Sequence, residues 1–252
     1  MSLVIGRFPF LITISSIFIG AYFANFSSFV SAIVVLVIIL LGIGMTLLAS
    51  KFLSKTVLKN MPSTFILELP PYRKPQFSKV LVRSILDRTI FVLGRAVSVA
   101  VPTGLVIWIF SNVCIGNISI LSYVATFLDP FAKLMGLDGY ILTAFLLGLP
   151  ANEIVLPIIL MSYLQKGVLI NLEDTFRIGE ILMQNGWTLL TAINIMIFSL
   201  LHFPCATTLL TIKKETGSYK WSLLAFLLPT VCGIVLCMGT TLLWNIGCTV
   251  FL

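Results

Sequence analysis

The chain has 252 residues, of which 59% are hydrophobic and only 10% are charged. An ordinary soluble domain has about a quarter of its residues charged, so this composition argues against a soluble domain and indicates an integral membrane protein. The formal net charge of +7 does not point to nucleic acid, because the basic residues gather beside apolar segments.

Six apolar runs follow one another along the chain, and each is about as long as, or longer than, the ~17–25 residues that a spanning helix needs. They cover residues 8–23, 29–48, 90–110, 140–164, 187–212 and 221–243. The run at 140–164 contains helix breakers, so we expect it to enter the bilayer without crossing it. The predicted fold is an all-α polytopic membrane protein with about five transmembrane helices, one re-entrant helical hairpin and one amphipathic interfacial helix.

The N-terminal region, residues 1–50, is predicted to form a tight transmembrane hairpin. Only residues 24–28 separate the first two runs, so the chain returns to the side from which it left. Arg7 before the first run is also compatible with a signal peptide, but the strong span that follows makes an ordinary first helix at least as good an interpretation.

Residues 51–89 form a basic loop between the second and third runs. Nine of the sixteen Lys and Arg residues fall between Lys51 and Arg95, against only Glu68 and Asp87. Such a loop beside membrane spans marks the cytoplasmic side, and anionic lipid is its natural secondary contact.

The second half of this loop changes character along its length. The stretch ELPPYRKP cannot be helical, because adjacent prolines remove backbone donors and force extended geometry on their neighbours. From residue 76 apolar residues recur at helical spacing, which predicts the amphipathic interfacial helix, with a solvated linker as the alternative.

Residues 90–252 are expected to form a second membrane region. Its segment 111–138 is interrupted by Gly116, Asp129–Pro130 and Gly136, and we interpret it as an outer-side or interfacial excursion. The run at 140–164 reads AFLLGLPANEIVLPIILM over residues 144–161, where Glu153 stands among apolar residues. A carboxylate buried in hydrocarbon costs roughly 2.5–3.5 kcal/mol on insertion scales, so a compensating environment is expected around it.

Charge supports a re-entrant hairpin at 140–164. If this run crossed fully, the lysines of KKETGSYK, residues 213–220, would lie on the outer face. If it enters and leaves by one face, they lie in the cytoplasm, and the loop 166–180, with a net charge of −1, lies outside. Residues 148–152 are then the tip, and arms of roughly ten residues reach the bilayer midplane.

The run at 187–212 is predicted to be a broken helix. Pro204 lies inside it, where its ring evicts a backbone hydrogen bond and frees a carbonyl near His202 or earlier. The only histidine, His202, and the cysteine Cys205 stand beside this break. Non-helical backbone survives at membrane depth only where protein or a water-filled cavity satisfies it, so the hairpin and the broken helix should meet near the midplane.

The residues at these two breaks offer donors for a cation. The carboxylate of Glu153, the carboxamide of Asn152, the imidazole of His202, the thiol of Cys205 and freed carbonyls can together replace the water shell of a divalent metal. Thiolate and imidazole favour Fe(II), Cu or Zn over Mg or Ca. A neutral solute such as a nucleoside could also be held by Asn152, Glu153 and helix ends.

Purely structural interpretations of the same residues stay open. His202 could be a hydrogen-bonded interior histidine and Cys205 a buried thiol, while Glu153 could cap the N-terminus of the second hairpin arm, where negative charge is favoured. The other four cysteines form no zinc-type spacing and are interpreted as small apolar core residues: Cys114, Cys232, Cys237 and Cys248.

Three motifs resemble one known family. The stretches ELPPYRKP, GLPANEIVLPI and HFPCATTLLTIKKETGSYKW each resemble parts of the FeoB family of bacterial ferrous-iron transporters, particularly its Gram-positive members. Their order and spacing fit the C-terminal half of that family's membrane domain, and the resemblance covers essentially the whole chain.

The resemblance implies uptake of Fe(II) through two gate motifs. The second gate matches at Gly148, Pro150, Asn152 and Glu153, and the family's Pro-Cys motif matches at Pro204 and Cys205. We expect Cys205 and Glu153 to contact the iron with Asn152 and His202 in support, and Gly148, Pro150 and Pro204 to shape the breaks. Of the first gate only the tail GRFPF remains, and Val4 stands where the family has a cysteine.

The sequence has no GxxxxGK[ST] motif, so it has no P-loop for a nucleotide. We therefore expect a transporter component rather than an enzyme, with Fe(II) as its transported substrate and no bound organic cofactor. The chain is expected to be one piece of a split transporter, a truncated form or a degenerate paralogue. The expected partners are the lipid bilayer, a GTP-binding subunit or N-terminal half in cis or trans, and further copies of the chain, but no nucleic acid.

The expected location is the inner (plasma) membrane, with a cytoplasmic N-terminus and an outer C-terminus. Two other functions stay open at this point: a gate-domain transporter of nucleosides or a related solute, and a non-transporting membrane scaffold.

Overall fold

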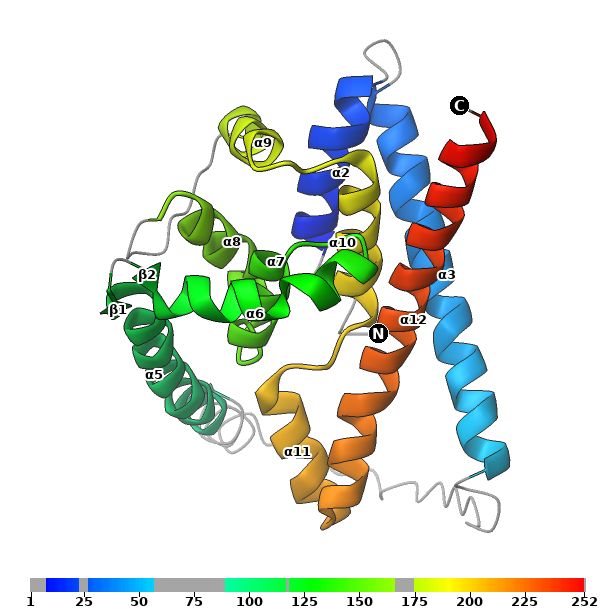
Figure 1. Cartoon of the computed structure of the whole chain (residues 1–252). Helices are drawn as coiled ribbons and strands as arrows, with labels where there is room; N and C mark the ends of the chain where they lie inside the picture. Colours follow the sequence, from blue (N-terminus) through cyan, green and yellow to red (C-terminus); the bar gives the residue numbers. More distant parts are fainter. Residues whose placement is uncertain (1–7, 23–26, 57–88, 117, 166–174, 252) are drawn as a thin grey trace, which may run out of the picture.

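The structure is a computed structural model that describes residues 8–22, 27–56, 89–116, 118–165 and 175–251. Over these residues the chain is almost entirely helical, with one short antiparallel ribbon of β1 (Cys114–Ile115) and β2 (Ile118–Ser119) (Figure 1). The predicted all-α membrane fold is confirmed. The helices are α2 (Phe8–Tyr22), α3 (Ser27–Thr56), α5 (Phe91–Asn112), α6 (Ile120–Leu134), α7 (Gly139–Leu147), η2 (Asn152–Ile154), α8 (Val155–Tyr163), α9 (Thr175–Gln184), α10 (Leu189–Leu201), α11 (Ala206–Thr216) and α12 (Tyr219–Phe251).

Four helices stand side by side on one side of the molecule. In Figure 1, α2, α3, α10 and α12 run roughly along the same direction, and α10 packs against the other three. The predicted N-terminal hairpin is present as α2 and α3, and α3 continues past residue 50 to Thr56. The hydroxyl of Ser15 donates to the carbonyl of Ser31 at 3.2 Å, and Ser31 donates back to Ser15 at 3.3 Å, which ties the two helices together.

Helix length gives fewer spans than the five expected from the sequence. Among the described residues, three helical stretches are long and apolar enough to cross a membrane: Phe29–Lys55, Leu189–Thr216 and Tyr219–Thr249. A fourth is reached if the bent pair α6 and α7 counts as one span. The apolar parts of α2 and α5 are shorter, because α2 ends at Tyr22 and Arg95 lies within the first turns of α5.

Helix α6 was not predicted, because we interpreted Asp129–Pro130 and Gly136 as interruptions of segment 111–138. In the structure Pro130 lies inside α6, and Asp129 forms an ion pair with Lys133 at 2.5 Å. Helix α7 follows at a bend of 111° and packs closely along α6. A β-carbon on Gly139 would lie 1.9 Å from the carbonyl oxygen of Ala125, so only glycine permits this approach.

The predicted hairpin at 140–164 is formed by α7, η2 and α8. Its two ends are held together at the base, where the hydroxyl of Tyr163 donates to the carboxylate of Asp138. Asp138 also caps α7 by accepting from the backbone of Ile141 at 2.7 Å, and Trp187 donates to the hydroxyl of Tyr163 at 2.8 Å. The chain thus enters and leaves the hairpin at neighbouring points.

A buried polar contact fixes α12 to the rest. Asn194 of α10 is fully buried, and its amide donates to the carbonyl of Met135 at 2.8 Å and to the hydroxyl of Thr241 at 2.9 Å. Thr240 donates to the amide oxygen of the same residue. Because both N–H groups and the oxygen of this amide have partners, it joins α10, α12 and the turn between α6 and α7 without leaving an unsatisfied polar atom.

Basic residues gather at one end of the described structure. The C-terminal end of α3, which carries Lys51 and Lys55, lies at the bottom of Figure 1. The end of α11, which carries Lys213 and Lys214, and the start of α12 lie at the same end, whereas the chain's C-terminus lies at the opposite one. Most of the basic loop and the expected amphipathic helix fall within residues 57–88, outside the described residues.

The interpretation of four cysteines as core residues is wrong for two of them. Cys237 is fully buried and Cys232 is half-buried, but Cys114 and Cys248 are exposed. A thiol is apolar enough to face lipid as well as protein, so its residue type alone did not distinguish the two environments.

The close approach of α6 and α7 can be tested at Gly139. Gly139→Val should lower the free energy of unfolding by about 1–3 kcal/mol or more, because the added carbons overpack a contact that has no room. The measurement is thermal unfolding of the purified chain in detergent. Gly104→Val on α5 is the control, since nothing lies within 4 Å of its β position; equal stability of the two variants would contradict the packing described.

Candidate functional site

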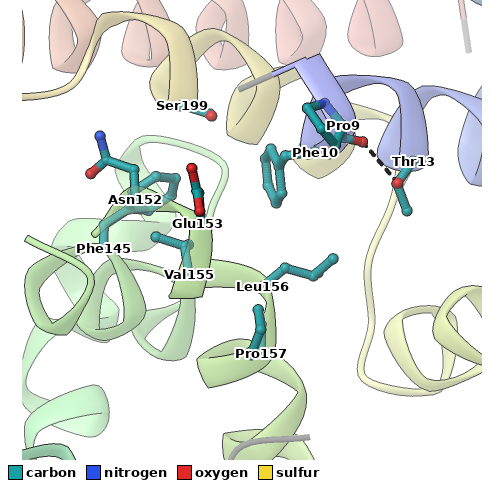
Figure 2. Close-up of a pocket in the computed structure, with 10 residues that line it drawn as sticks. All are labelled: Pro9, Phe10, Thr13, Phe145, Asn152, Glu153, Val155, Leu156, Pro157 and Ser199. Atoms are coloured by element: carbon teal, nitrogen blue, oxygen red, sulfur yellow. Dashed lines mark hydrogen bonds between the residues drawn. The ribbon is translucent and has the colours of Figure 1, made fainter. Parts of the chain in front are cut away.

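The hairpin tip lines a cavity of about 470 Å³, which we call the gate cavity. It lies between the tip, α8, the start of α2 and the end of α10 (Figure 2). Its polar lining consists of Asn152, Glu153, Ser199 and Thr13, and its apolar lining of Pro9, Phe10, Phe145, Val155, Leu156 and Pro157. Three separate parts of the chain therefore converge on one space that holds a single carboxylate among its described lining residues.

Glu153 is exposed and lines this cavity. It lies in η2, directly before α8, and neither helix is capped by a side-chain hydrogen bond. Glu153 nevertheless stands at the N-terminus of the second hairpin arm, the position considered for it from the sequence, where negative charge is favoured. The positive end of the α8 dipole and access to the cavity are what stabilise the charge here.

The tip is narrow because two residues permit it. Gly148 ends α7 by donating to the carbonyl of Ala144 at 2.8 Å, and a β-carbon on it would lie 2.6 Å from the side chain of Val155. Pro150 follows, and its ring has no N–H to satisfy. The arms can therefore turn back on each other within residues 148–151.

The broken helix is interrupted at residues 202–205, between α10 and α11, as predicted. His202 is 2% exposed and its side chain completes the end of α10. Its Nδ1 lies 2.8 Å from the carbonyl oxygen of Ser199 and 3.1 Å from that of Phe198, which also accepts from the backbone N–H of His202 at 2.8 Å. The imidazole therefore supplies a buried partner chiefly for the carbonyl of Ser199 at the end of α10. The ring packs against Phe145 and Phe203, with centroids 4.8 and 5.1 Å apart.

Two polar contacts join the break to the tip. The Nε2 atom of His202 lies 3.1 Å from the amide oxygen of Asn152. The backbone N–H of Ala206, the first residue of α11, donates to the carbonyl of Leu149 at 2.9 Å. The two broken elements therefore meet, and the contact runs through the residues next to Glu153 on one side and Cys205 on the other.

Cys205 lies at this junction but is not among the described residues that line the gate cavity. It is the N-cap residue of α11 and is half-buried. Its sulfur lies 3.1 Å from the hydroxyl oxygens of both Thr207 and Thr208. Hydroxyls at a helix N-terminus favour a thiolate, which is the form of cysteine that binds metals.

The spacing of two tryptophans on α12 indicates the depth of the junction. Trp221 and Trp244 are 23 residues apart, which is about 35 Å at 1.5 Å per residue and close to the ~30 Å hydrocarbon core that interfacial aromatics flank. Gly233 lies at the midpoint, and a β-carbon on it would lie 3.4 Å from that of Leu201, the last residue of α10. If the two tryptophans mark the two interfaces, the break lies near the bilayer midplane.

No ready-made metal cluster is present in the described part of the chain. No group of three or more His, Cys, Asp or Glu side chains among these residues is placed to hold an ion. Glu153 and Asn152 share the gate cavity, whereas His202 is bonded behind Asn152 and Cys205 lies at the start of α11. Thr13 and Ser199 also line the cavity and were not predicted; Ser199 precedes His202 by three residues and could have been suspected from helical spacing.

Comparison with protein families gives two matches. The gate family described as "Nucleoside recognition" matches residues 93–219, about half of the chain. The family described as "Ferrous iron transport protein B C terminus" matches residues 35–87. The first match covers the hairpin, the break and everything between them.

Curated relatives match over nearly the whole chain. An "Fe(2+) transporter FeoB" of Staphylococcus aureus is 34% identical over 240 residues, which cover 92% of this chain and 33% of the relative. The protein of that name in Methanocaldococcus jannaschii is 26% identical over 247 residues, 92% of this chain and 35% of the relative. A "Fe(2+) transport protein A/Fe(2+) transporter FeoB fusion protein" of Porphyromonas gingivalis is 24% identical over 234 residues, 74% of this chain and 28% of the relative.

The chain thus spans about a third of the length of these relatives. No solved structure gives a significant match.

The role of His202 at the break can be tested by stability. His202→Leu should lower the free energy of unfolding by about 1–3 kcal/mol, because the carbonyl of Ser199 loses a buried partner. Thermal unfolding in detergent measures this, with His202→Gln as the matched variant that keeps a side-chain donor and should be less destabilised. Equal stability of His202→Leu and the unchanged chain would show that the imidazole does not hold the break.

Proposed function

Since this chain belongs to the FeoB family, matching the C-terminal part of its membrane domain, we propose that it forms the gate-bearing part of a ferrous-iron uptake transporter. The observation that carries the proposal is the gate cavity, where a carboxylate stands at the tip of a broken hairpin beside a broken helix. Substrate sites of transporters are commonly built from such discontinuous helices near the midplane.

Within the proposal, Glu153 and Asn152 are the first groups to contact the cation in the gate cavity. A carboxylate and a carboxamide oxygen, with the hydroxyls of Thr13 and Ser199, offer oxygen donors that take the place of lost waters. The negative charge of Glu153 attracts the dication, and the apolar remainder of the lining strengthens this attraction by lowering the local dielectric constant.

Cys205 supplies the preference for Fe(II). Oxygen donors alone suit Mg and Ca, whereas a thiolate favours softer transition metals. Cys205 directly precedes Ala206, whose backbone N–H is hydrogen-bonded to Leu149 of the tip. A cation that leaves the tip therefore reaches the sulfur of Cys205 next. His202 acts through Asn152, and Gly148, Pro150 and Pro204 maintain the shape of the two breaks.

The remaining parts of a transporter are assigned to partners. The sequence has no P-loop, so GTP binding belongs to another part of the same protein or to a second subunit, and the chain itself acts in transport rather than in an enzyme reaction. The end that carries Lys51, Lys55, Lys213 and Lys214 is the cytoplasmic end, which puts the C-terminus outside. Further copies of the chain in the same bilayer are compatible with its exposed apolar helices.

A second candidate function is transport of a nucleoside or a related solute. It is favoured by the description of the gate family that matches residues 93–219. The rings of Phe10 and Phe145 in the gate cavity could contact a base, while Asn152 and Glu153 bond to it. Binding of Fe(II), Mn(II) and nucleosides to the purified chain, measured by thermal shift, separates the two functions.

The iron path can be tested by two substitutions in the complete transporter. Glu153→Gln and Cys205→Ser should each lower Fe(II) uptake by about ten- to a hundredfold, because each removes one contact to a charged ligand worth ~1.5–3 kcal/mol. Uptake is measured in proteoliposomes. The matched controls are Glu180→Gln and Cys248→Ser, which change exposed residues of α9 and α12 and should leave uptake unchanged.

An uptake rate that survives both Glu153→Gln and Cys205→Ser would contradict the proposed function. Loss of uptake in Cys205→Ser alone would remove Glu153 from the path and leave the thiol as its only selective contact.

A further inference from the structure

The hairpin carries a second cavity at its other end, beside the base. This cavity has a volume of about 400 Å³ and lies between the end of α5, the β1–β2 ribbon, α6, α7 and the end of α8. Its described lining contains no Asp, Glu, Lys, Arg or His, yet most of it is polar. The polar groups are chiefly those of Ser111, Ser122, Thr126, Tyr140, Ser162 and Gln165.

Such a gathering is unusual in a chain this apolar. Polar groups inside a membrane protein are costly unless they pair with one another or face a water-filled space. These groups come from four helices, α5, α6, α7 and α8, and from the turn after α8, and they line a single space, so packing within one helix does not account for them. The cavity is a built polar site.

Hydroxyl groups of the lining use their protons in hydrogen bonds to other protein atoms. Thr126 donates to the carbonyl of Ser122 at 2.8 Å, and Ser162 donates to the carbonyl of Ile158 at 2.7 Å. Tyr140 donates to the hydroxyl of Ser122 at 3.5 Å. A hydroxyl has one proton and two lone pairs, so these groups leave mainly acceptor lone pairs for a ligand.

The uncharged lining offers mainly hydroxyl oxygens as acceptors, beside the carboxamide of Gln165, which can donate or accept, and this favours a ligand that presents donors over most of its surface. A hydrated divalent cation does this, because its waters direct their hydrogens outward. A water takes up about 30 Å³ of liquid volume, so six waters need roughly 180 Å³, and the cavity of about 400 Å³ has room for them. An anion would find no basic side chain in the described lining.

We propose that this cavity is a vestibule that binds the hydrated divalent cation, through its waters, before it reaches the gate cavity. The inference rests on the proposed function, since it gives the same cation an earlier position. Helix α8 connects the two sites: Met161 and Ser162 line the vestibule, and Val155 and Leu156 line the gate cavity. The nine residues of α8 extend over about 13 Å at 1.5 Å per residue, so a short movement takes the cation from one to the other.

Hexaamminecobalt(III) is the probe that tests the vestibule. Its six ammonia ligands donate hydrogen bonds as bound waters do and do not exchange, so it occupies a site that binds through waters and not one that strips them. The triple variant Ser122→Ala, Thr126→Val, Ser162→Ala removes three acceptors with little change in volume. Binding to the chain in nanodiscs, measured by calorimetry, should weaken by at least about tenfold, because one average hydrogen bond already corresponds to several-fold.

The matched control is the double variant Ser98→Ala, Thr103→Val on α5. It removes two hydroxyls that lie outside the vestibule. Like Thr126 and Ser162, each of them donates to the backbone carbonyl four residues earlier, Ser98 at 2.7 Å and Thr103 at 2.8 Å. It should bind the probe as the unchanged chain does. If the triple variant does not fold, Thr126→Val alone, at an exposed position of α6, should still weaken binding several-fold.

Undiminished binding of the probe to the vestibule variants would overturn the inference, and so would its displacement by a neutral nucleoside. Glu153→Gln, at the far end of α8, should leave probe binding unchanged. Iron uptake that survives both Glu153→Gln and Cys205→Ser contradicts only the proposed function, whereas binding of the probe that is unchanged by the vestibule substitutions contradicts only the vestibule.

Discussion

The structure depends on the contact between the hairpin tip and the helix break. Both elements interrupt apolar helices of a membrane domain, where an unpaired backbone group in the hydrocarbon has no water to bond to. The carbonyl of Leu149 and the N–H of Ala206 satisfy each other across the contact, and His202 links the carbonyls at the end of α10 to Asn152. Neither break would be tolerated alone, so the two are held together and the gate cavity forms beside them.

The other polar contacts of the interior keep that junction in place. At the base of the hairpin, Asp138, Tyr163 and Trp187 form a chain of hydrogen bonds that holds α7 beside α8. Near the opposite side, Asn194 joins α10 to α12. In an apolar surrounding such satisfied groups permit few alternative arrangements, because separating them exposes each group without a partner. A carboxylate at the tip can then be held at a fixed place in the membrane.

The sequence predicted those features that a local pattern encodes. Pro204 predicted the break, and Gly148 with Pro150 predicted the hairpin tip. Proline restricts the backbone and glycine permits tight turns wherever they occur. Helix α6 was missed, since Asp129–Pro130 resembles a helix end and only the packing of α7 against it reveals otherwise. Thr13 and Ser199 were missed because their convergence with Glu153 depends on tertiary packing between distant segments. The separation of Cys205 from the gate cavity was equally inaccessible, as spacing along the chain does not give direction across a break.

The central claim is that the tip and the break are joined, and a disulfide tests it most directly. In a variant without the native cysteines, Leu149→Cys and Ala206→Cys should cross-link readily in the membrane under mild oxidation. The reason is that the two residues are joined by a backbone hydrogen bond, with 2.9 Å between N and O, and so lie within reach of a disulfide. Leu149→Cys combined with Thr249→Cys, at the far end of α12, should not cross-link. Failure of the first pair to react, or equal reaction of both pairs, would contradict the account.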